Sequence, residues 1–262
     1  MKITIEELIG SRKNWFRNWF DTEFYHKLYS HRNEKEAEEI VNEIIQELQP
    51  KHGASMLDLG CGNGRHAKYL AAQGFNVTGL DLAFSSIQHA RKWETETLRF
   101  YTHDMREPFG DTCFDYVFNF FTSFGYFSTE ENNRVIQNMV NSVRGNGFVM
   151  IDYMNVAHSV KGLVPEEEKE IDGIVYRIKR WTDEKYIYKR IEIDNIQADR
   201  PYIYTEKVMK LNKKDFHEMF EKNGLKPIKV YGDYKLNEYQ VETSPRLILL
   251  AQKIGQRRTC LK

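Results

Sequence analysis

Short apolar runs alternate with helical patterns of apolar residues through the middle of the chain. The runs that read as buried strands cover residues 55–59, 75–80, 98–102, 114–120 and 147–153. The helical patterns between them cover residues 64–73, 84–94 and 129–143. Alternating strands and helices build βαβ units, in which the strands are parallel and helices cover the sheet. The pattern therefore predicts a doubly wound α/β core.

The first 50 residues are predicted to be helical. A short helix contains Leu8 and Ile9, and an amphipathic helix runs from Glu34 to Leu48. Between them, aromatic residues repeat at helical spacing: Trp15, Phe16, Trp19 and Phe20. Such an aromatic face can lie on a membrane surface, or it can cap the core at the mouth of an active site. Because the chain carries no net charge, we favour the cap and treat residues 1–50 as an N-terminal helical lid.

Residues 161–211 are predicted to be an insertion. An acidic turn, Pro165–Glu168, precedes three runs in which charged and apolar residues alternate: 171–181, 186–193 and 202–211. Alternation of this kind is typical of antiparallel strands with one buried face, so we expect a three-stranded meander. It could cover an active site or form a dimer contact. The core is expected to comprise residues 51–160 and 212–254, with a last helix that Asn212 and Asp215 begin and a final hairpin of 227–231 and 246–252.

Composition excludes several classes of partner. The chain has 38 Lys and Arg against 38 Asp and Glu, so no overall basic bias favours nucleic acid or an anionic membrane. No apolar run is long enough to span a bilayer, and the N-terminus lacks the apolar core of a signal peptide. The three cysteines, Cys61, Cys113 and Cys260, show no metal spacing. We therefore expect a reduced, cytoplasmic protein with no metal.

The stretch Met56–Arg65 carries the clearest chemical signal. An apolar strand ends at Leu59, glycines follow at 60, 62 and 64, and a helical pattern begins after them. Strand, glycine turn and helix open a nucleotide-binding βαβ unit, because glycine allows a tight turn and close approach of a ligand to the backbone. The next strand ends on Asp81, about 20 residues after the first glycine, where a carboxylate can bind both hydroxyls of a ribose.

The glycine spacing separates two kinds of nucleotide site. A dinucleotide fingerprint requires glycine at 60, 62 and 65, but position 65 is Arg65. The sequence Asp58-Leu-Gly-Cys-Gly-Asn-Gly64 instead resembles the first motif of class I S-adenosylmethionine-dependent methyltransferases. That resemblance covers residues 25–153 well and 205–252 loosely. It implies a Rossmann-like, seven-stranded, mostly parallel sheet and S-adenosyl-L-methionine as cofactor, with S-adenosyl-L-homocysteine as product.

The resemblance also assigns residues to the cofactor. It places Asp104 at the adenine amino group and the backbone of Met105 at the ring edge. The Tyr25-x-x-x-Tyr29 run resembles the N-terminal segment of small-molecule N-methyltransferases, including those acting on amino sugars, and implies that Tyr29 and Arg32 touch the methionyl part. Arg32 as a solvated charge and Tyr29 as a packing residue are equally open. The full set of expected cofactor residues is Tyr29, Arg32, Asp58, Gly60, Cys61, Gly62, Gly64, Asp81, Leu82, Asp104, Met105, Asn119 and Phe120.

The acceptor side is expected near the loop Phe121–Phe127, which follows the fourth core strand. This loop is similar to that of small-molecule methyltransferases and lacks the two prolines found in enzymes that methylate amino groups of nucleic-acid bases. The expected acceptor pocket comprises Trp19, Tyr25, Phe121, Phe124, Tyr126 and Tyr153. No residue stands out as an unmistakable catalyst, and Tyr153 and His158 are the candidates.

The sequence therefore predicts methyl transfer to a small-molecule amine or hydroxyl, achieved by positioning and by exclusion of water. The expected partner is a small molecule, without nucleic acid or membrane, and a homodimer is left open. A catalytically silent S-adenosylmethionine-binding regulator is the main alternative. An NAD-type oxidoreductase is disfavoured by Arg65.

Overall fold

A computed structural model describes residues 15–30, 34–109, 114–194 and 201–255. The chain divides into two compact units. One unit is formed from Met1–His31 and Gly162–Lys210, and the other from Arg32–Lys161 and Leu211–Lys262. We call the first the insert unit and the second the core unit.

The core unit is built on a seven-stranded sheet in the order β10-β11-β5-β4-β1-β2-β3. The strands are β1 (Ser55–Leu59), β2 (Asn76–Asp81), β3 (Leu98–Thr102), β4 (Phe114–Asn119), β5 (Val143–Met154), β10 (Leu225–Tyr231) and β11 (Arg246–Lys253). The pairs formed by β1 to β5 are parallel, and β11 is antiparallel to both β5 and β10. The predicted doubly wound, seven-stranded, mostly parallel sheet is confirmed.

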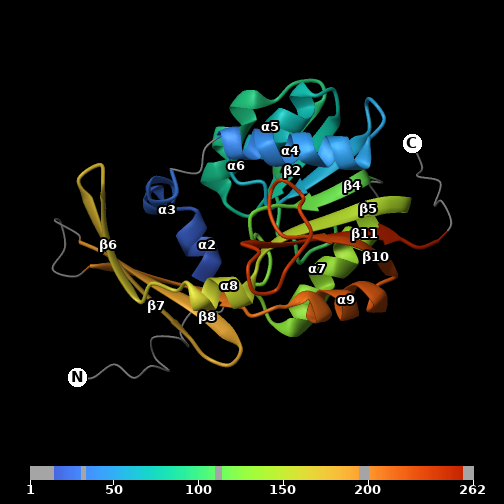
Figure 1. Cartoon of the computed structure of the whole chain (residues 1–262). Helices are drawn as coiled ribbons and strands as arrows, with labels where there is room; N and C mark the ends of the chain where they lie inside the picture. Colours follow the sequence, from blue (N-terminus) through green and yellow to red (C-terminus); the bar gives the residue numbers. More distant parts are fainter. Residues whose placement is uncertain (1–14, 31–33, 110–113, 195–200, 256–262) are drawn as a thin grey trace. The chain divides into compact units, whose positions relative to one another are not determined.

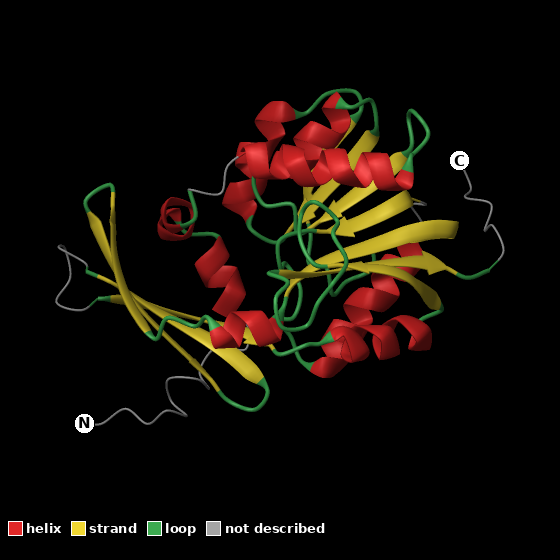
Figure 2. Ribbon diagram, in the orientation of Figure 1, coloured by secondary structure: helices red, strands yellow, loops and turns green. Residues whose placement is uncertain are grey.

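Helices cover both faces of this sheet (Figures 1 and 2). The helices α4 (Glu34–Leu48), α5 (Arg65–Ala72) and α6 (Phe84–Ala90) lie on one face, and α7 (Thr129–Ser142) and α9 (Lys213–Lys222) lie on the other. A 3₁₀ turn, Arg91–Trp93, follows α6, and α8 (Val156–Lys161) follows β5. Asn212 and Asp215 form the predicted capping box at the start of α9, and Ser128 and Glu131 form another at α7. Each box satisfies amides that a helix start leaves unpaired.

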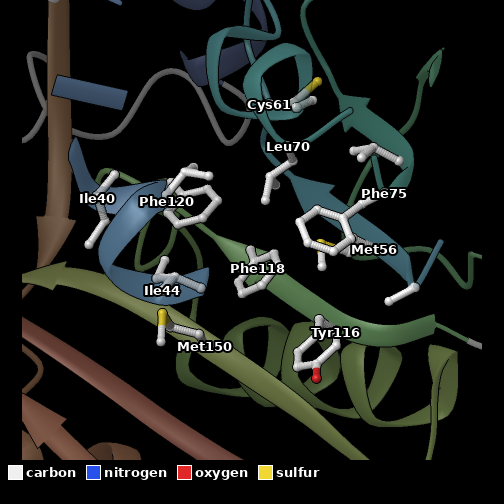
Figure 3. Packing of buried hydrophobic residues seen from close by; sticks show 14 of the residues in the cluster. Ile40, Ile44, Met56, Cys61, Leu70, Phe75, Tyr116, Phe118, Phe120 and Met150 are labelled. Atoms are coloured by element: carbon white, nitrogen blue, oxygen red, sulfur yellow. The ribbon is translucent and has the colours of Figure 1, made fainter. Parts of the chain in front are cut away.

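The core under α4 and α5 is a continuous cluster of buried side chains (Figure 3). Phe118 of β4 and Phe120, just after the end of that strand, lie toward Ile40 and Ile44 of α4. Burying these apolar faces stabilises the layers, because removing apolar surface from water contributes about 25 cal/mol per Å². The amphipathic helix of residues 34–48 therefore belongs to the core unit and not to the predicted lid of residues 1–50.

Strand order fixes where a ligand can bind. β1 pairs with β2 on one side and with β4 on the other, so the chain reverses its direction of winding between β1 and β4. In open α/β sheets a crevice forms at this reversal, outside the carboxyl ends of the two strands. Here those ends are Leu59 and Asn119.

The insert unit is a four-stranded antiparallel sheet, β6-β7-β8-β9, with the helices α2 (Trp15–Phe20) and α3 (Glu23–Leu28). The strands are β6 (Glu166–Ile171), β7 (Ile174–Thr182), β8 (Tyr186–Ile193) and β9 (Tyr202–Met209). The expected three-stranded meander is corrected to four strands. The acidic segment predicted to be a turn is part of β6, which is antiparallel to β7. Ion pairs between Glu166 and Lys179 and between Glu167 and Arg180 also join these two strands.

The core of the insert unit joins the two ends of its discontinuous sequence. Trp19 is fully buried with Tyr176, Ile178, Ile191 and Ile193 of β7 and β8. Its indole nitrogen donates to Glu206 of β9 at 2.7 Å. Trp19 of the predicted aromatic face is therefore part of the core of this unit, and Trp15 and Phe20 pack against that core. The short helix expected around Leu8 and Ile9 lies outside the described residues.

No helix in the described ranges combines the length and the apolar character needed to cross a bilayer.

Candidate active site

The glycine turn lies at the carboxyl end of β1 and leads into α5. Gly60, Gly62 and Gly64 all have positive φ, between 53° and 81°. A Cβ on Gly60 would lie 2.6 Å from the Cβ of Ser123, whereas one on Gly62 would meet nothing within 4 Å. Gly60 is required because the loop after β4 packs directly against it. The surface beside Gly62 is open, as a ligand site requires.

The backbone amides of this turn donate within the protein. The amides of Gly60 and Cys61 donate to the carbonyl of Leu80 at 2.7 and 3.0 Å, and that of Gly64 donates to the carbonyl of Cys61 at 2.9 Å. The amide of Gly62 donates to the carboxylate of Asp81 at 2.8 Å. Phosphate-binding loops need such amides to face the ligand. This turn is therefore poorly suited to a pyrophosphate, which agrees with the reading of Arg65 in the sequence.

Asp81 ends β2 beside the glycine turn. Its two oxygens accept from the amides of Gly62 and Ala83, each at 2.8 Å. These bonds fix the plane of the carboxylate at the carboxyl end of β2, beside the glycine turn. Because each carboxylate oxygen can accept two hydrogen bonds, ribose hydroxyls can be bound in addition to the amides.

Two buried acceptors lie at the ends of β1 and β4. The side chain of Asp58 is fully buried, and neither of its oxygens has a hydrogen-bond partner of good geometry among the described residues, although the amide of Ala67 faces it. Burial, followed by the charge of Asp81, raises the pKa of Asp58 to about 7. Asn119 donates from Nδ2 to the carbonyl of Leu59 at 2.7 Å, while its Oδ1 has no partner in the described part of the chain.

Buried acceptors without donors fit a ligand that brings a cation or N–H groups. S-adenosylmethionine carries an ammonium, a sulfonium and a ribose diol, and no phosphate. The donor and acceptor groups around the glycine turn therefore suit this cofactor better than NAD.

Asp104 and Met105 follow β3 in the loop where the adenine contacts are expected. The carboxylate of Asp104 pairs with Arg106, whose Nε and Nη2 donate to it at 3.0 and 2.7 Å. Arg106 also donates to Glu131 of α7 at 2.8 Å, and the carbonyl of Met105 accepts from Asn138 at 3.0 Å. The loop is thus anchored to α7, and the orientation of Asp104 is set by Arg106. The adenine contact itself stays a prediction.

The residues proposed for the acceptor pocket separate into two groups. Phe121 and Tyr126 are partly exposed, and the Tyr126 hydroxyl donates to the carbonyl of Thr122 at 2.6 Å. Phe124 and Tyr153 are fully buried and pack against Phe216 of α9 at ring-centroid distances of 5.6 and 5.2 Å. Both side chains are therefore part of the core in this structure, and their contact with an acceptor is untested.

The two candidate catalysts differ in their surroundings. Burial raises the pKa of Tyr153 far above its ordinary value, so this hydroxyl is a poor proton acceptor near neutral pH. His158 is exposed on α8, whereas the sequence reading placed it in a loop. Burial also raises the pKa of the Cys61 thiol, which keeps it protonated. The described residues contain no cluster of acidic, histidine or cysteine side chains arranged to hold a metal.

Several expected site residues belong to other surroundings. Phe120 is buried, and its ring stacks on His66 with the centroids 4.4 Å apart, so only its backbone remains for a cofactor. Trp19, Tyr25 and Tyr29 belong to the insert unit, where the Tyr29 hydroxyl donates to Glu206 at 2.7 Å. Arg32 lies outside the described residues. The cofactor and acceptor roles of these residues stay predictions.

Three polar residues that the sequence reading did not place at the site meet beside the loop after β4. They are Asp152 of β5, Arg246 of β11 and Tyr234, which lies between β10 and β11. Their hydrogen bonds hold Phe121 and Thr122. Two features of the sequence point to this group. One is a charged residue, Asp152, inside the apolar run 147–153, and the other is an arginine, Arg246, at the start of the last strand.

Comparisons with known proteins agree with this geometry. Residues 56–147 match the family model of the methyltransferase domain. A putative methyltransferase of Geobacillus sp. is 34% identical over 101 residues, which are 37% of this chain and 41% of that protein. A ubiquinone biosynthesis O-methyltransferase of Rickettsia felis is 32% identical over 126 residues, 42% of this chain and 50% of that protein. The chain thus spans less than two thirds of the length of these relatives.

Solved structures share the fold across most of the chain. An S-adenosylmethionine-dependent methyltransferase from Clostridium acetobutylicum superposes with a TM-score of 0.74 at 16% identity, covering 88% of this chain and 97% of that one. The sugar N-methyltransferase KedS8 from Streptoalloteichus sp. gives a TM-score of 0.67 at 18% identity, covering 88% and 92%. The chain has the fold of the class I S-adenosylmethionine-dependent methyltransferases. Within that fold, residues 56–147 are the part that matches the methyltransferase-domain model.

Proposed function

We propose that this protein transfers a methyl group from S-adenosylmethionine to a small-molecule amine or hydroxyl. One observation carries the proposal: the Asp81 carboxylate and the buried acceptor Asp58 flank a glycine turn in which the amides of residues 60, 61, 62 and 64 already have partners. That arrangement would accept hydrogen bonds from a ribose and attract a cation, and it has little to offer a phosphate.

Bound S-adenosylmethionine would supply a methyl group on a positively charged sulfonium, which is a strong electrophile. The protein then has to hold the acceptor in line with that methyl and to exclude water. Asp81 would orient the ribose, Asp58 would face the ammonium, and the loop from Phe121 to Tyr126 would form the wall of the crevice. A neutral amine needs no strong base, which suits a site where Tyr153 is buried with a raised pKa.

The nature of the acceptor follows from composition and from the matched proteins. The chain is electrically neutral overall, so it lacks the excess of positive charge that a nucleic-acid substrate favours. The matched proteins include both an O-methyltransferase and a sugar N-methyltransferase, so either atom remains open as the acceptor. We place the protein in the cytoplasm as part of the same proposal. A homodimer remains open, and sedimentation would decide it.

Calorimetric titration tests the cofactor. We expect S-adenosylmethionine and S-adenosylhomocysteine to bind and NAD to give no signal. NAD binding without an adenosylmethionine signal would overturn the proposal. Methyl transfer to a panel of amines and phenols then separates an enzyme from a silent binding protein, which would bind the cofactor and methylate nothing.

The Asp81→Asn variant is expected to bind S-adenosylhomocysteine at least roughly tenfold more weakly, because charge-assisted bonds to both ribose hydroxyls become weaker. The oxygen of the asparagine side chain can still accept from one of the two backbone amides, those of Gly62 and Ala83, and we expect the fold to persist. Calorimetry gives the dissociation constant, and thermal unfolding without ligand is the control. Unchanged affinity in a folded variant would move the ribose contact to another residue.

A further inference from the structure

The loop after β4 contains two consecutive residues in a conformation that side chains disfavour. Phe121 and Thr122 have φ of 58° and 59°. This left-handed region suits glycine and is rare for a β-branched residue such as threonine. Neighbouring interactions must therefore hold the loop in place.

Those interactions come from the buried Asp152 and from the partly buried Tyr234 and Arg246. The Asp152 carboxylate accepts from the Phe121 amide at 2.8 Å, and the Asp152 carbonyl accepts from the Thr122 amide at 2.9 Å. Arg246 donates to that carboxylate at 2.7 Å and to the Thr122 hydroxyl at 2.9 Å. The Tyr234 hydroxyl donates to the Asp152 carboxylate at 2.9 Å. Both left-handed residues are thus tied to one carboxylate and its partners.

The ring of Phe121 is held as well. Its centroid lies 5.0 Å from the guanidinium carbon of Arg65 and 5.3 Å from that of Arg246. Arg65 is itself paired with Glu36 of α4 at 2.9 Å. Burial alone would lower the pKa of Arg246, but the charge and hydrogen bond of Asp152, together with Tyr234 and Glu36, outweigh burial and raise the pKa, so the guanidinium stays charged.

The loop conformation bears directly on the glycine turn. Ser123, the next residue, donates to the Gly60 carbonyl at 3.3 Å and leaves no room for a side chain on Gly60. If Phe121 and Thr122 relaxed to negative φ, Ser123 would leave this position and one wall of the turn would be lost.

We propose that Asp152, Tyr234 and Arg246 are positioning residues, which hold the strained Phe121–Thr122 backbone so that the loop forms one wall of the cofactor site. The inference rests on the proposed function, because it assigns these residues to the same site. None of the three has to touch the cofactor.

Two tyrosines allow a matched test. Tyr234 and Tyr239 are both half-buried. The Tyr239 hydroxyl donates to the side chain of Asn155 at 3.1 Å, and Asn155 is three residues after Asp152 in the sequence. We expect Tyr234→Phe to weaken S-adenosylhomocysteine binding by roughly tenfold and Tyr239→Phe by less than about twofold. Equal effects of the two variants on affinity would overturn the proposal, since each removes one hydroxyl hydrogen bond.

A second substitution separates positioning from general stability. Asparagine adopts the left-handed region more readily than threonine. Thr122→Asn in the Tyr234→Phe background should therefore restore affinity to within about threefold of wild type, because the backbone then needs less support. Failure of this rescue would overturn the positioning role.

Hydrogen exchange of the ligand-free protein keeps this test independent of the cofactor. The Phe121 and Thr122 amides should exchange faster in Tyr234→Phe than in Tyr239→Phe. If the wild-type protein bound no S-adenosylhomocysteine, the proposed function would fail while this comparison still held. Unchanged exchange in Tyr234→Phe would overturn the inference alone.

Discussion

At about pH 8, the ligand-free Asp58→Asn variant is expected to be more stable than the wild-type protein by up to about 4 kcal/mol. Burial, with the charge of Asp81 second, raises the pKa of Asp58 to about 7 in the fold, against an ordinary value of 3.8. At a pH between these two pKa values, Asp58 is protonated in the folded state and ionised in the unfolded state, so the folded state binds more protons. Stability therefore falls as pH rises from about 4 to about 7, and the full cost of the buried charge is present above that window. Asparagine has nearly the same shape and carries no charge.

Urea unfolding of both proteins at about pH 4.5 and about pH 8 measures this difference, which should be small at the lower pH and large at the higher. Asp233→Asn is the control with the opposite sign, because burial of Asp233 is outweighed by the hydrogen bonds from Asn237 and Lys235 and by the Lys235 charge, which together lower its pKa. A stability gain for Asp58→Asn that does not change with pH would contradict the assignment of an ionised, buried carboxylate.

The same substitution is expected to weaken S-adenosylmethionine binding, since the neutral amide no longer attracts the ligand's ammonium. The wild-type protein would thus keep a residue that destabilises its empty state because that residue serves the occupied one. Residues that trade stability for function in this way are common at active sites.

Trp19→Ala is expected to destabilise the insert unit by about 3–5 kcal/mol. Trp19 is fully buried, packs over the apolar side chains of β7 and β8, and donates to Glu206. Alanine would leave a cavity and remove the donor. Faster hydrogen exchange of the backbone amides of β7 and β8 would show this loss of stability. The control is Trp93→Ala, because Trp93 is 46% exposed in the core unit and should change stability by less than about 1 kcal/mol.

The burial of Trp19 also affects the interpretation of a variant that lacks residues 1–24. The lid hypothesis predicts that deleting residues 1–24 abolishes methyl transfer more than it weakens the fold. That deletion removes Trp19 and exposes the apolar face of the insert unit, so it cannot separate a lid from a structural core. If Trp19→Ala left the exchange of β7 and β8 unchanged, the segment would again qualify as a detachable lid.

The core fold was predictable because its signals are local. Apolar runs at residues 55–59 and 98–102 match β1 and β3 at both ends, and the capping box at Asn212 begins α9. The glycine turn and Asp81 were found because such spacings are set by backbone geometry within one βαβ unit. Each of these features is decided by residues close together in the sequence.

Features that depend on distant residues were missed. The edge strand β6 is acidic and resembles a solvated turn until its partners on β7 supply opposite charges. The membership of α2 in the insert unit depends on β7, β8 and β9, and the support of Phe121 depends on Asp152 and Arg246. None of these pairings has a local pattern, so hydrophobic periodicity could not reveal them.

The discontinuity of the insert unit has a consequence for synthesis on the ribosome. The hydrogen bond from Trp19 to Glu206 joins residues 187 positions apart. Because a chain emerges from its N-terminus, the aromatic residues of α2 must wait for β7, β8 and β9 before they can be buried. Exposed aromatic surface on a nascent chain is a target for chaperones and a risk for aggregation. Helix α2 is therefore synthesised well before β7, β8 and β9, and it can reach its final packing only after those strands have been made.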